Sequence, residues 1–310
     1  MEKRVHHGLL VVCLVAACGG IAFAASAAKA GELRGSVGCE LNSRLELSAN
    51  DTVWNYPVTP AGSNTAQVNL SSAASAYADY NCGLVNFQFG VGGTDYFPAN
   101  YGMDNGLGGF NSVEQYGHGE LDMFLRDPHS YALGLGVDYQ LDSFNRYGYG
   151  TRAGVVLNDN TSYIRPSIFA DYYASENVTL GVDASYRKGN QSGTSSASIQ
   201  GLGAGAHVFY YPAPNMRLSL SGTVGASTKD YAAYSAHNNY YSGSFGAEYK
   251  FADTALSMFT NASYSSNNYT YSAFYVPDAA NGISASVGMR FDIGPHANGT
   301  LVDLQRNGVR

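Results

Sequence analysis

The stretch Ile283-Ser284-Ala285-Ser286-Val287-Gly288-Met289-Arg290-Phe291-Asp292-Ile293 alternates strictly between two kinds of side chain. Every second residue is apolar, and the residues between are small, polar or charged. Because successive side chains of a β-strand point to opposite faces, this pattern predicts a strand with one apolar and one polar face. The apolar face either packs against a protein core or faces lipid, and the rest of the chain distinguishes these two cases.

The same alternation recurs along the chain in segments of about ten residues, with no helical period between them. We predict strands at 36–47, 67–80, 84–96, 112–125, 131–141, 162–173, 177–188, 199–211, 216–226, 240–251, 255–265 and 282–293. No apolar run after the N-terminal segment is long enough for a transmembrane helix. A membrane-spanning chain of this kind must therefore be a closed barrel, because only helices and barrels satisfy their backbone polar groups in lipid.

The connections between the predicted strands alternate between short and long. The short ones are 81–82, 126–128, 174–176, 212–214 and 252–253, and the long ones are 48–66, 97–111, 142–161, 189–198, 227–239 and 266–281. Outer-membrane barrels have short periplasmic turns and long outer loops, whereas a soluble sandwich has no reason to keep this order. The sequence therefore predicts an all-β, closed antiparallel transmembrane barrel of about 12 strands at residues 31–294. Residues 147–157 also resemble a strand, but a further strand would break the alternation, so we expect them in an outer loop.

The N-terminus has the pattern of an export signal. Lys3 and Arg4 precede an apolar run over 9–17, and small residues follow. We predict a signal peptide over residues 1–30, cleaved after Ala24 or Ala30, and a location in the Gram-negative outer membrane. Two of the four cysteines lie in this segment. The remaining Cys39 and Cys82 fall near one rim of the predicted barrel, and we expect them to form a disulfide.

The charge balance and the remaining sequence exclude several kinds of partner. Removing residues 1–30 takes away three basic residues and one acidic residue, which leaves 14 basic and 23 acidic residues. Such an acidic chain is a poor candidate for nucleic-acid binding. Neither exported cysteine has a metal ligand at suitable spacing, and the sequence implies no cofactor. Residues 295–310 form a polar tail, which we expect in the periplasm, either free or folded into the lumen.

Charged residues on the polar faces of the strands are the main lead to function. By strand parity, the pore-lining candidates are Glu120, Asp122, Asp138, Arg165, Asp183, Arg187, Arg217, Glu248, Arg290 and Asp292, with Asp171 and Lys250 on the same faces. These charges either form a salt-bridged plug that fills the barrel or line a pore whose fixed charges bias ion passage. Many of the other inward positions are Gly, Ser or Ala, which favours open space.

An enzyme embedded in the barrel is a further possibility that the histidines raise. His118 is the most suggestive, because Glu120 and Asp122 share its strand face. A hydrolase needs a nucleophile beside a base that a third group holds, and no serine lies in a recognisable position near His118. His207 lies among Gly201, Gly203 and Gly205, which are not a phosphate loop because no helix follows. We predict no catalytic residue.

Several hairpins of the chain resemble a known group. Phe124-Leu125-Arg126-Asp127-Pro128 with Ala132-Leu133-Gly134-Leu135, and Tyr210-Tyr211-Pro212 with the segment 215–219, are similar to hairpins of porin-like outer-membrane proteins of alphaproteobacteria. Segments 246–251 and 287–291 are similar to later strands, and Leu301 with Arg306 resembles the basic tail. The resemblance covers about residues 112–310 and implies an outer-membrane barrel of no established substrate.

These observations together predict a porin-like channel that lets small hydrophilic solutes or ions diffuse across the outer membrane. The partners would be outer-membrane lipid and those solutes, and the oligomeric state is left open. One alternative is a non-conducting structural or surface-exposed barrel. The second alternative is a barrel hydrolase that acts on lipid.

Overall fold

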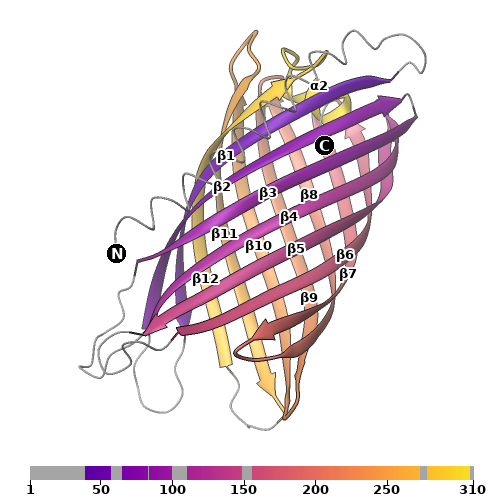
Figure 1. Ribbon diagram of the computed structural model, residues 1–310. Helices are drawn as coiled ribbons and strands as arrows, with labels where there is room; N and C mark the ends of the chain where they lie inside the picture. The colour runs from indigo at the N-terminus through magenta and orange to yellow at the C-terminus, as the bar shows by residue number, and fades with distance from the viewer. Residues whose placement is uncertain are drawn as a thin grey trace.

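The computed structural model describes residues 39–56, 65–82, 84–99, 110–148, 156–272 and 278–307. These residues form twelve antiparallel strands, each paired with its neighbours in sequence, and β12 pairs with β1 to close the barrel (Figure 1). The strands are β1 (Glu40–Tyr56), β2 (Thr65–Cys82), β3 (Val85–Ala99), β4 (Phe110–Asp127), β5 (Tyr131–Gly148), β6 (Val156–Ser175), β7 (Val178–Gly193), β8 (Ala197–Ala213), β9 (Met216–Tyr231), β10 (Ser235–Lys250), β11 (Leu256–Tyr271) and β12 (Asp278–Ile293). A short helix, α2 (Leu301–Asn307), follows β12. The predicted fold class is confirmed.

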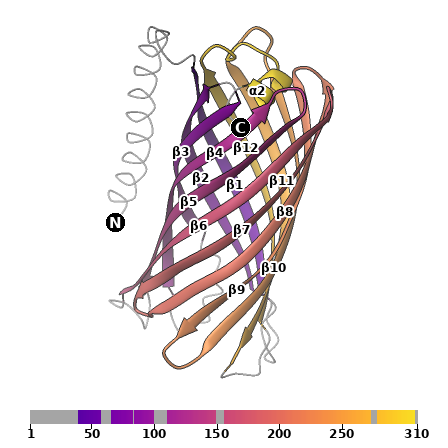
Figure 2. The same ribbon diagram turned by 90° about the vertical axis from the view of Figure 1, so that its right-hand side faces the viewer.

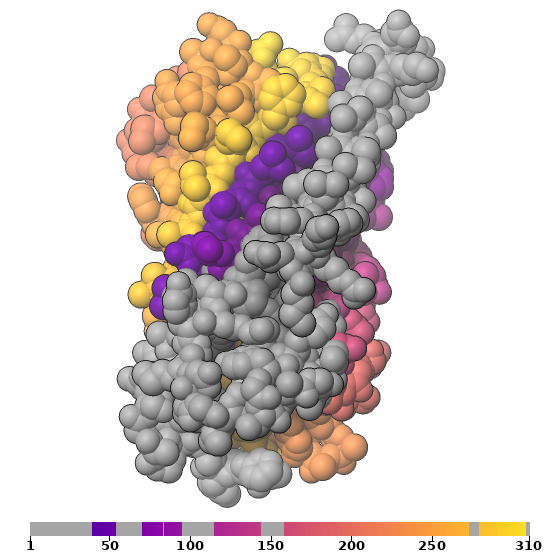
Figure 3. Space-filling view, turned by 60° about the vertical axis from the view of Figure 1, so that its left-hand side comes forward, coloured from indigo at the N-terminus to yellow at the C-terminus, as the bar shows by residue number. Residues whose placement is uncertain are grey.

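The closing seam joins the first strand, β1, to the last strand, β12. Register pairs Ser43 of β1 with Ile293 of β12 and continues to Asn55 and Asn281. Figure 3 shows the seam from outside, with the indigo strand β1 directly beside the yellow C-terminal strands. Because every strand has a neighbour on both sides, the barrel has no free edge.

The strands are longer than the alternating pattern predicted. They run for 15 to 20 residues, whereas about 9–11 tilted residues suffice to cross a bilayer. Much of the segments expected as long outer loops is therefore strand, and only residues 194–196 connect β7 to β8 and 232–234 connect β9 to β10. Of the segment 147–157, two residues end β5 and two begin β6, and residues 149–155 lie outside the described part.

The outer surface explains why these extensions were missed. Near the short turns the outward residues are apolar and exposed, as in Tyr131, Leu133, Leu135, Val137 and Tyr139 of β5. Beyond this belt the outward residues become polar, and β7 presents Lys188, Asn190 and Ser192 as exposed side chains. Where both faces are polar, the alternation that marks a half-apolar strand disappears. On β5 and β7 the apolar outward residues therefore lie on the part of the strand nearer the short turns.

The turn between β4 and β5 shows what the Arg126-Asp127-Pro128 motif does. Arg126 Nη2 lies 3.2 Å from Asp79 Oδ2 of β2, and both side chains are fully buried. The guanidinium also covers the Phe124 ring at 4.7 Å. Asp127 accepts a bond from the His129 backbone N–H at 3.1 Å, which lowers the pKa of its exposed carboxyl. The motif therefore ties the turn to the barrel interior and is structural.

The disulfide lies at the same end of the barrel. Cys39 and Cys82 are bonded, directly beside the Glu40–Asn81 pair that begins the β1–β2 ladder. The bond thus joins the start of β1 to the end of β2 at the short-turn rim. Among the described residues, no helix is long and apolar enough to cross a membrane.

Candidate lumen site

The ten predicted pore-lining residues all lie on the inner face of the barrel. Glu120, Asp122, Arg217 and Arg290 line a cavity in the half of the barrel nearer the short turns. Arg165, Asp183 and Arg187 line a second cavity nearer the other end. The remaining three, Asp138, Glu248 and Asp292, are buried and each forms a salt bridge with an inward arginine. We call the two spaces the inner and the outer cavity.

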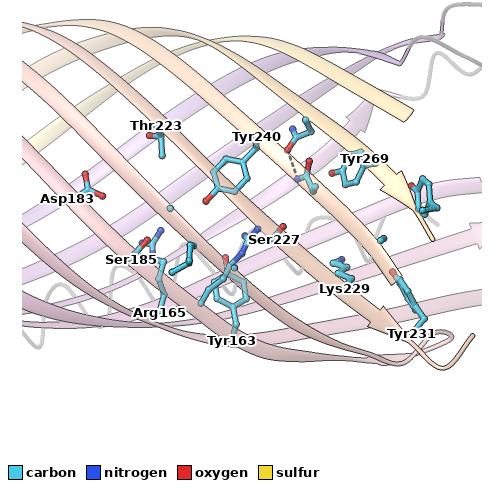
Figure 4. A pocket seen from close by; sticks show the side chains of 18 residues that line it. Tyr163, Arg165, Asp183, Ser185, Thr223, Ser227, Lys229, Tyr231, Tyr240 and Tyr269 are labelled. Atoms are coloured by element: carbon cyan, nitrogen blue, oxygen red, sulfur yellow. Dashed lines mark hydrogen bonds between the residues drawn. The ribbon is translucent and has the colours of Figure 1, made fainter. Parts of the chain in front are cut away.

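The outer cavity has a volume of about 600 Å³ and lies against strands β6 to β11 (Figure 4). Its wall combines aromatic rings, cationic groups, hydroxyls and amides. The tyrosines that line it are Tyr163, Tyr231, Tyr240, Tyr269 and Tyr271. Tyr240 reaches from β10 over the glycines of β9 and β8, and Figure 4 shows Tyr163 and Arg165 on another part of the wall. The volume is in the range of small-molecule sites.

Glycines on β8 and β9 make room for the side chains of this cavity. A Cβ atom at Gly203 would lie 2.7 Å from the Tyr240 hydroxyl, and one at Gly201 would lie 2.9 Å from Arg187 Nε. A Cβ at Gly225 would overlap the Cζ and hydroxyl of Tyr240. The Gly201-x-Gly203-x-Gly205 spacing therefore has a packing role, because each glycine faces a large or charged side chain from β7 or β10.

The inner cavity has a volume of about 430 Å³, and one side of its wall is a ladder of paired charges. Arg290 Nε lies 2.6 Å from Glu46 Oε2, and its Nη1 lies 2.5 Å from Glu248 Oε2. Glu248 also pairs with Arg217 and accepts a bond from Ser257 at 2.7 Å. The register explains this network, since Glu248 is directly opposite Arg217 and Arg290 is directly opposite Glu46.

The ladder continues from β12 to β1. Arg44 Nε lies 2.9 Å from Asp292 Oδ1, and Lys250 Nζ lies 3.5 Å from the other oxygen of that carboxylate. The guanidiniums that reach the cavity from this side are those of Arg44, Arg217 and Arg290. Strands β9 to β12 and β1 are consecutive around the barrel. They therefore form one continuous wall that carries cationic groups into the lumen.

The facing wall of the inner cavity is acidic. Glu120 and Asp122 come from β4 and Asp171 from β6. Glu120 accepts a bond from Gln88 Nε2 at 3.1 Å, and Asp171 Oδ1 lies 3.1 Å from His207 Nε2. Acidic groups on one side and arginines on the other create a field across the lumen, which acts on any charged solute inside.

The C-terminal helix α2 spans the mouth of the barrel at the short-turn end, as Figure 2 shows from the side. Leu301 and Leu304 are buried against Tyr211, with Phe209 packed beside them. Arg306 donates to the Ser175 carbonyl at 2.7 Å and covers the Tyr173 ring at 5.2 Å. The predicted polar tail is thus partly a helix with a buried apolar face.

Further bonds hold the helix to the opposite rim. Asn42 of β1 donates to the Asn307 carbonyl at 3.1 Å, and the His296 ring lies between Glu40 at 3.2 Å and Asp303 at 3.0 Å. Gln305 accepts a bond from Arg217 and lines the inner cavity. Because β1 and β7 lie opposite each other in the ring of strands, α2 crosses the mouth from one side to the other.

Several residues of the site were missing from the sequence prediction. Arg44, Glu46 and Asp79 lie on β1 and β2, whose alternation is the weakest of the chain. Lys229, Tyr231, Tyr269 and Tyr271 lie where β9 and β11 continue past the predicted strand ends, and inward parity would have found them if those strands had been extended. Tyr163 and Tyr240 lie within predicted strands, but the prediction considered only charged residues as lining groups.

His118, which raised the hydrolase alternative, lies on β4 opposite Gly92 of β3. His118 Nδ1 is buried and has no hydrogen-bond partner among the described residues. The ring lies 5.7 Å from that of Tyr116 on the same face of β4. A base that activates a nucleophile needs the nucleophile within hydrogen-bond reach. Within the described ranges there is also no group of three residues that could hold a metal ion.

No family model and no curated protein matches this sequence. Solved structures with a similar fold are outer-membrane barrels. A crystal structure of an outer membrane channel from Pseudomonas putida F1 has a TM-score of 0.52 at 11% identity, covering 82% of this chain and 96% of that chain. The translocator domain of the autotransporter NalP from Neisseria meningitidis has a TM-score of 0.50 at 9% identity, covering 89% and 95%.

At these identities the similarity extends to the fold alone. The apolar outer belt and the closed barrel are the features that a chain needs to cross a bilayer with strands. The protein is an outer-membrane β-barrel of a Gram-negative bacterium.

Proposed function

We propose that this barrel is a channel through which small hydrophilic solutes diffuse across the outer membrane. The observation that carries the proposal is the lumen itself, which has a polar and charged wall and contains two cavities of about 600 and 430 Å³. Interior positions of a closed barrel are either filled by side chains or left as space for water and solutes.

The ten predicted residues would act as pore-lining groups under this proposal. The arginine wall and the acidic wall of the inner cavity would orient a dipolar solute and bias the passage of ions. The signal peptide over residues 1–30 would direct export. Under this proposal the protein is not an enzyme.

A non-conducting structural barrel is the second candidate, and α2 is the observation that favours it. The helix lies across the mouth at the short-turn end and is anchored on both sides. If α2 excludes solute completely, the two cavities would be closed at the short-turn end and solute could not pass through the barrel.

Single-channel recording in a planar bilayer tests the proposal. We expect the purified, folded full-length protein to give discrete ohmic current steps, because water fills a polar lumen. A folded and inserted barrel that stays silent would instead support the structural candidate. Lipid-directed hydrolysis that disappears in His118→Ala would support an enzyme and contradict both.

A further inference from the structure

Two arginines lie side by side on the wall of the outer cavity. The β6–β7 register pairs Ile164 with Lys188 and Ser167 with Ser185, which sets Arg165 directly across from Arg187. Like charges at directly opposed positions of neighbouring strands destabilise a sheet. The arrangement thus costs stability, and an anion bound in the cavity would offset that cost.

The two guanidiniums differ in how they are neutralised. Arg165 Nη2 lies 2.9 Å from Asp138 Oδ2. In the described part of the chain no carboxylate forms a salt bridge with Arg187, and its Nε is buried without a hydrogen-bond partner. The Arg187 guanidinium instead lies 5.5 Å from the centre of the Tyr240 ring. Arg187 therefore has the capacity to bind an anion that enters the cavity.

The rest of the cavity wall adds positive charge. Lys229 lines it and donates to the neutral Gln191 amide at 3.1 Å. Asp183 is the one acidic side chain among the described lining residues, against the three cations Arg165, Arg187 and Lys229. Asp142 and Asp159 act on Lys229 from outside the lining, but the described lining residues themselves carry a net positive charge, which favours anions.

The neutral groups indicate what kind of anion fits. The tyrosine rings offer flat apolar faces with a polar edge. Hydroxyl and amide groups lie between them, namely Ser185, Thr223, Ser227, Asn238 and Asn267, and the two asparagines are hydrogen-bonded at 3.0 Å. Donors and acceptors interleaved with aromatic faces match a sugar ring, which has hydroxyls at its rim and an apolar face of C–H groups.

We infer that the outer cavity is a binding site for an acidic sugar, with its carboxylate on Arg187 and its ring against Tyr240. The inference rests on the proposed channel function and names the class of solute that the channel would take. The carboxylate would form charge-assisted bonds with the Arg187 fork and with Arg165, which are the strong class of hydrogen bond. The ring hydroxyls would bind the serine and asparagine side chains.

Binding and current block together test this inference, with sodium glucuronate as the probe. Glucuronate added at the loop side should interrupt the single-channel current and should titrate calorimetrically against the protein in detergent. Glucose should bind about tenfold or more weakly, because it lacks the charge that pairs with arginine. Benzoate, which has a carboxylate but no hydroxyls, should also bind more weakly than glucuronate.

Matched variants on adjacent residues locate the site. Arg187→Gln removes a charge inside the cavity and should weaken glucuronate binding by about tenfold or more. Lys188→Gln removes the same charge from the exposed outer face of the same strand and should leave binding unchanged. Tyr240→Leu and its outward neighbour Tyr241→Leu form a second pair with the same expectation.

The outcomes separate the inference from the channel proposal. A conducting barrel that neither binds glucuronate nor is blocked by it overturns the inference and leaves the channel in place. A silent barrel that still binds glucuronate, with the expected loss in Arg187→Gln, supports the site and overturns the channel. Benzoate binding as tightly as glucuronate, or equal effects of Arg187→Gln and Lys188→Gln, would overturn the assignment to acidic sugars at this position.

Discussion

Side chains on one strand of this barrel fit against residues of nearby strands, and some positions require a glycine as strictly as others require a large side chain. Gly225 and Gly203 belong to neighbouring strands, and both lie under the Tyr240 ring. Gly243 by contrast faces outward, and a Cβ there would meet only the Ser221 carbonyl at 3.8 Å. Gly225 and Gly243 therefore differ in whether they tolerate a side chain, because only Gly225 faces a side chain in the lumen.

Gly225→Ala should displace the Tyr240 ring and destabilise the barrel by about 1–3 kcal/mol, the usual effect of overpacking. The unfolding midpoint in urea, followed by tyrosine fluorescence or by gel mobility, measures the change. Gly243→Ala is the control and should leave the midpoint close to that of the unmodified protein. Equal midpoints for the two variants would mean that Tyr240 moves aside without strain.

The buried ion pair Arg126–Asp79 gives a second prediction at this scale. Asp79→Asn removes the charge that faces a fully buried guanidinium, and breaking such a pair from one side costs about 3–5 kcal/mol. Asp51→Asn, on the exposed outer face of β1, should have little effect. The free energy of unfolding of the two variants provides the comparison, and similar values would show that water reaches Arg126.

At the scale of elements, α2 lies across the mouth of the barrel at the short-turn end. The helix is too short to be stable alone, so its order depends on Leu301 and Leu304 against Tyr211 and on the bonds to β1 and the β6–β7 turn. The barrel itself closes through β1 and β12 and does not need the helix. We therefore expect a chain without α2 to keep its strands.

A chain that ends at Gly299 should conduct with larger current steps than the full-length protein, because the inner cavity then opens directly to the periplasmic side. Leu301→Gln with Leu304→Gln should shift the full-length protein in the same direction. Asn298→Gln, at an exposed position of the same tail, is the control. Identical step sizes for the truncated and full-length proteins would mean that α2 leaves the mouth open.

The strands and the helix were predictable to different degrees. Residues such as Leu133, Leu135 and Val137 revealed their strand because lipid requires an apolar outer face. Asn190 and Ser192 gave no such signal, because outside the lipid belt the outward side chains are polar. For α2, the spacing of Leu301 and Leu304, and Thr300 bonding the Asp303 N–H at 3.1 Å, are local signals that fit a capped helical turn, but seven residues are too few for periodicity to show.

For the whole molecule, the positions of the charges matter more than their sum. Formal net charge is −7, yet Arg44, Arg217 and Arg290 reach the inner cavity from one wall, with Glu46 beside them. Acidic side chains without arginines, those of Glu120, Asp122 and Asp171, reach it from the other wall. The ten residues that sequence parity assigned to the polar faces lie toward the lumen. Which of them would meet across the seam depended on the closure of β12 onto β1, and this pairing could not be read from local patterns.

Ion selectivity should respond to single charges on the arginine wall. Arg290→Gln should raise the preference for cations by about twofold or more, since a unit charge a few Å away changes an ion's energy by about 1 kcal/mol or more. Glu248→Gln should shift selectivity toward anions. The reversal potential under a potassium chloride gradient measures both, with Lys188→Gln as the control. A common shift in all three variants would place the selectivity outside the inner cavity.

The Cys39–Cys82 bond has a consequence for how the barrel is built. It needs only the first hairpin, whereas the partner strand of β1 on its other side is the last strand of the chain. Until β12 arrives, β1 presents an unsatisfied edge that is open to wrong pairing. A covalent link at the base of the hairpin fixes the alignment of β1 on β2 before β12 pairs with β1. Oxidation of the two cysteines in the periplasm would thus give the newly inserted chain a correctly aligned first strand on which the barrel closes.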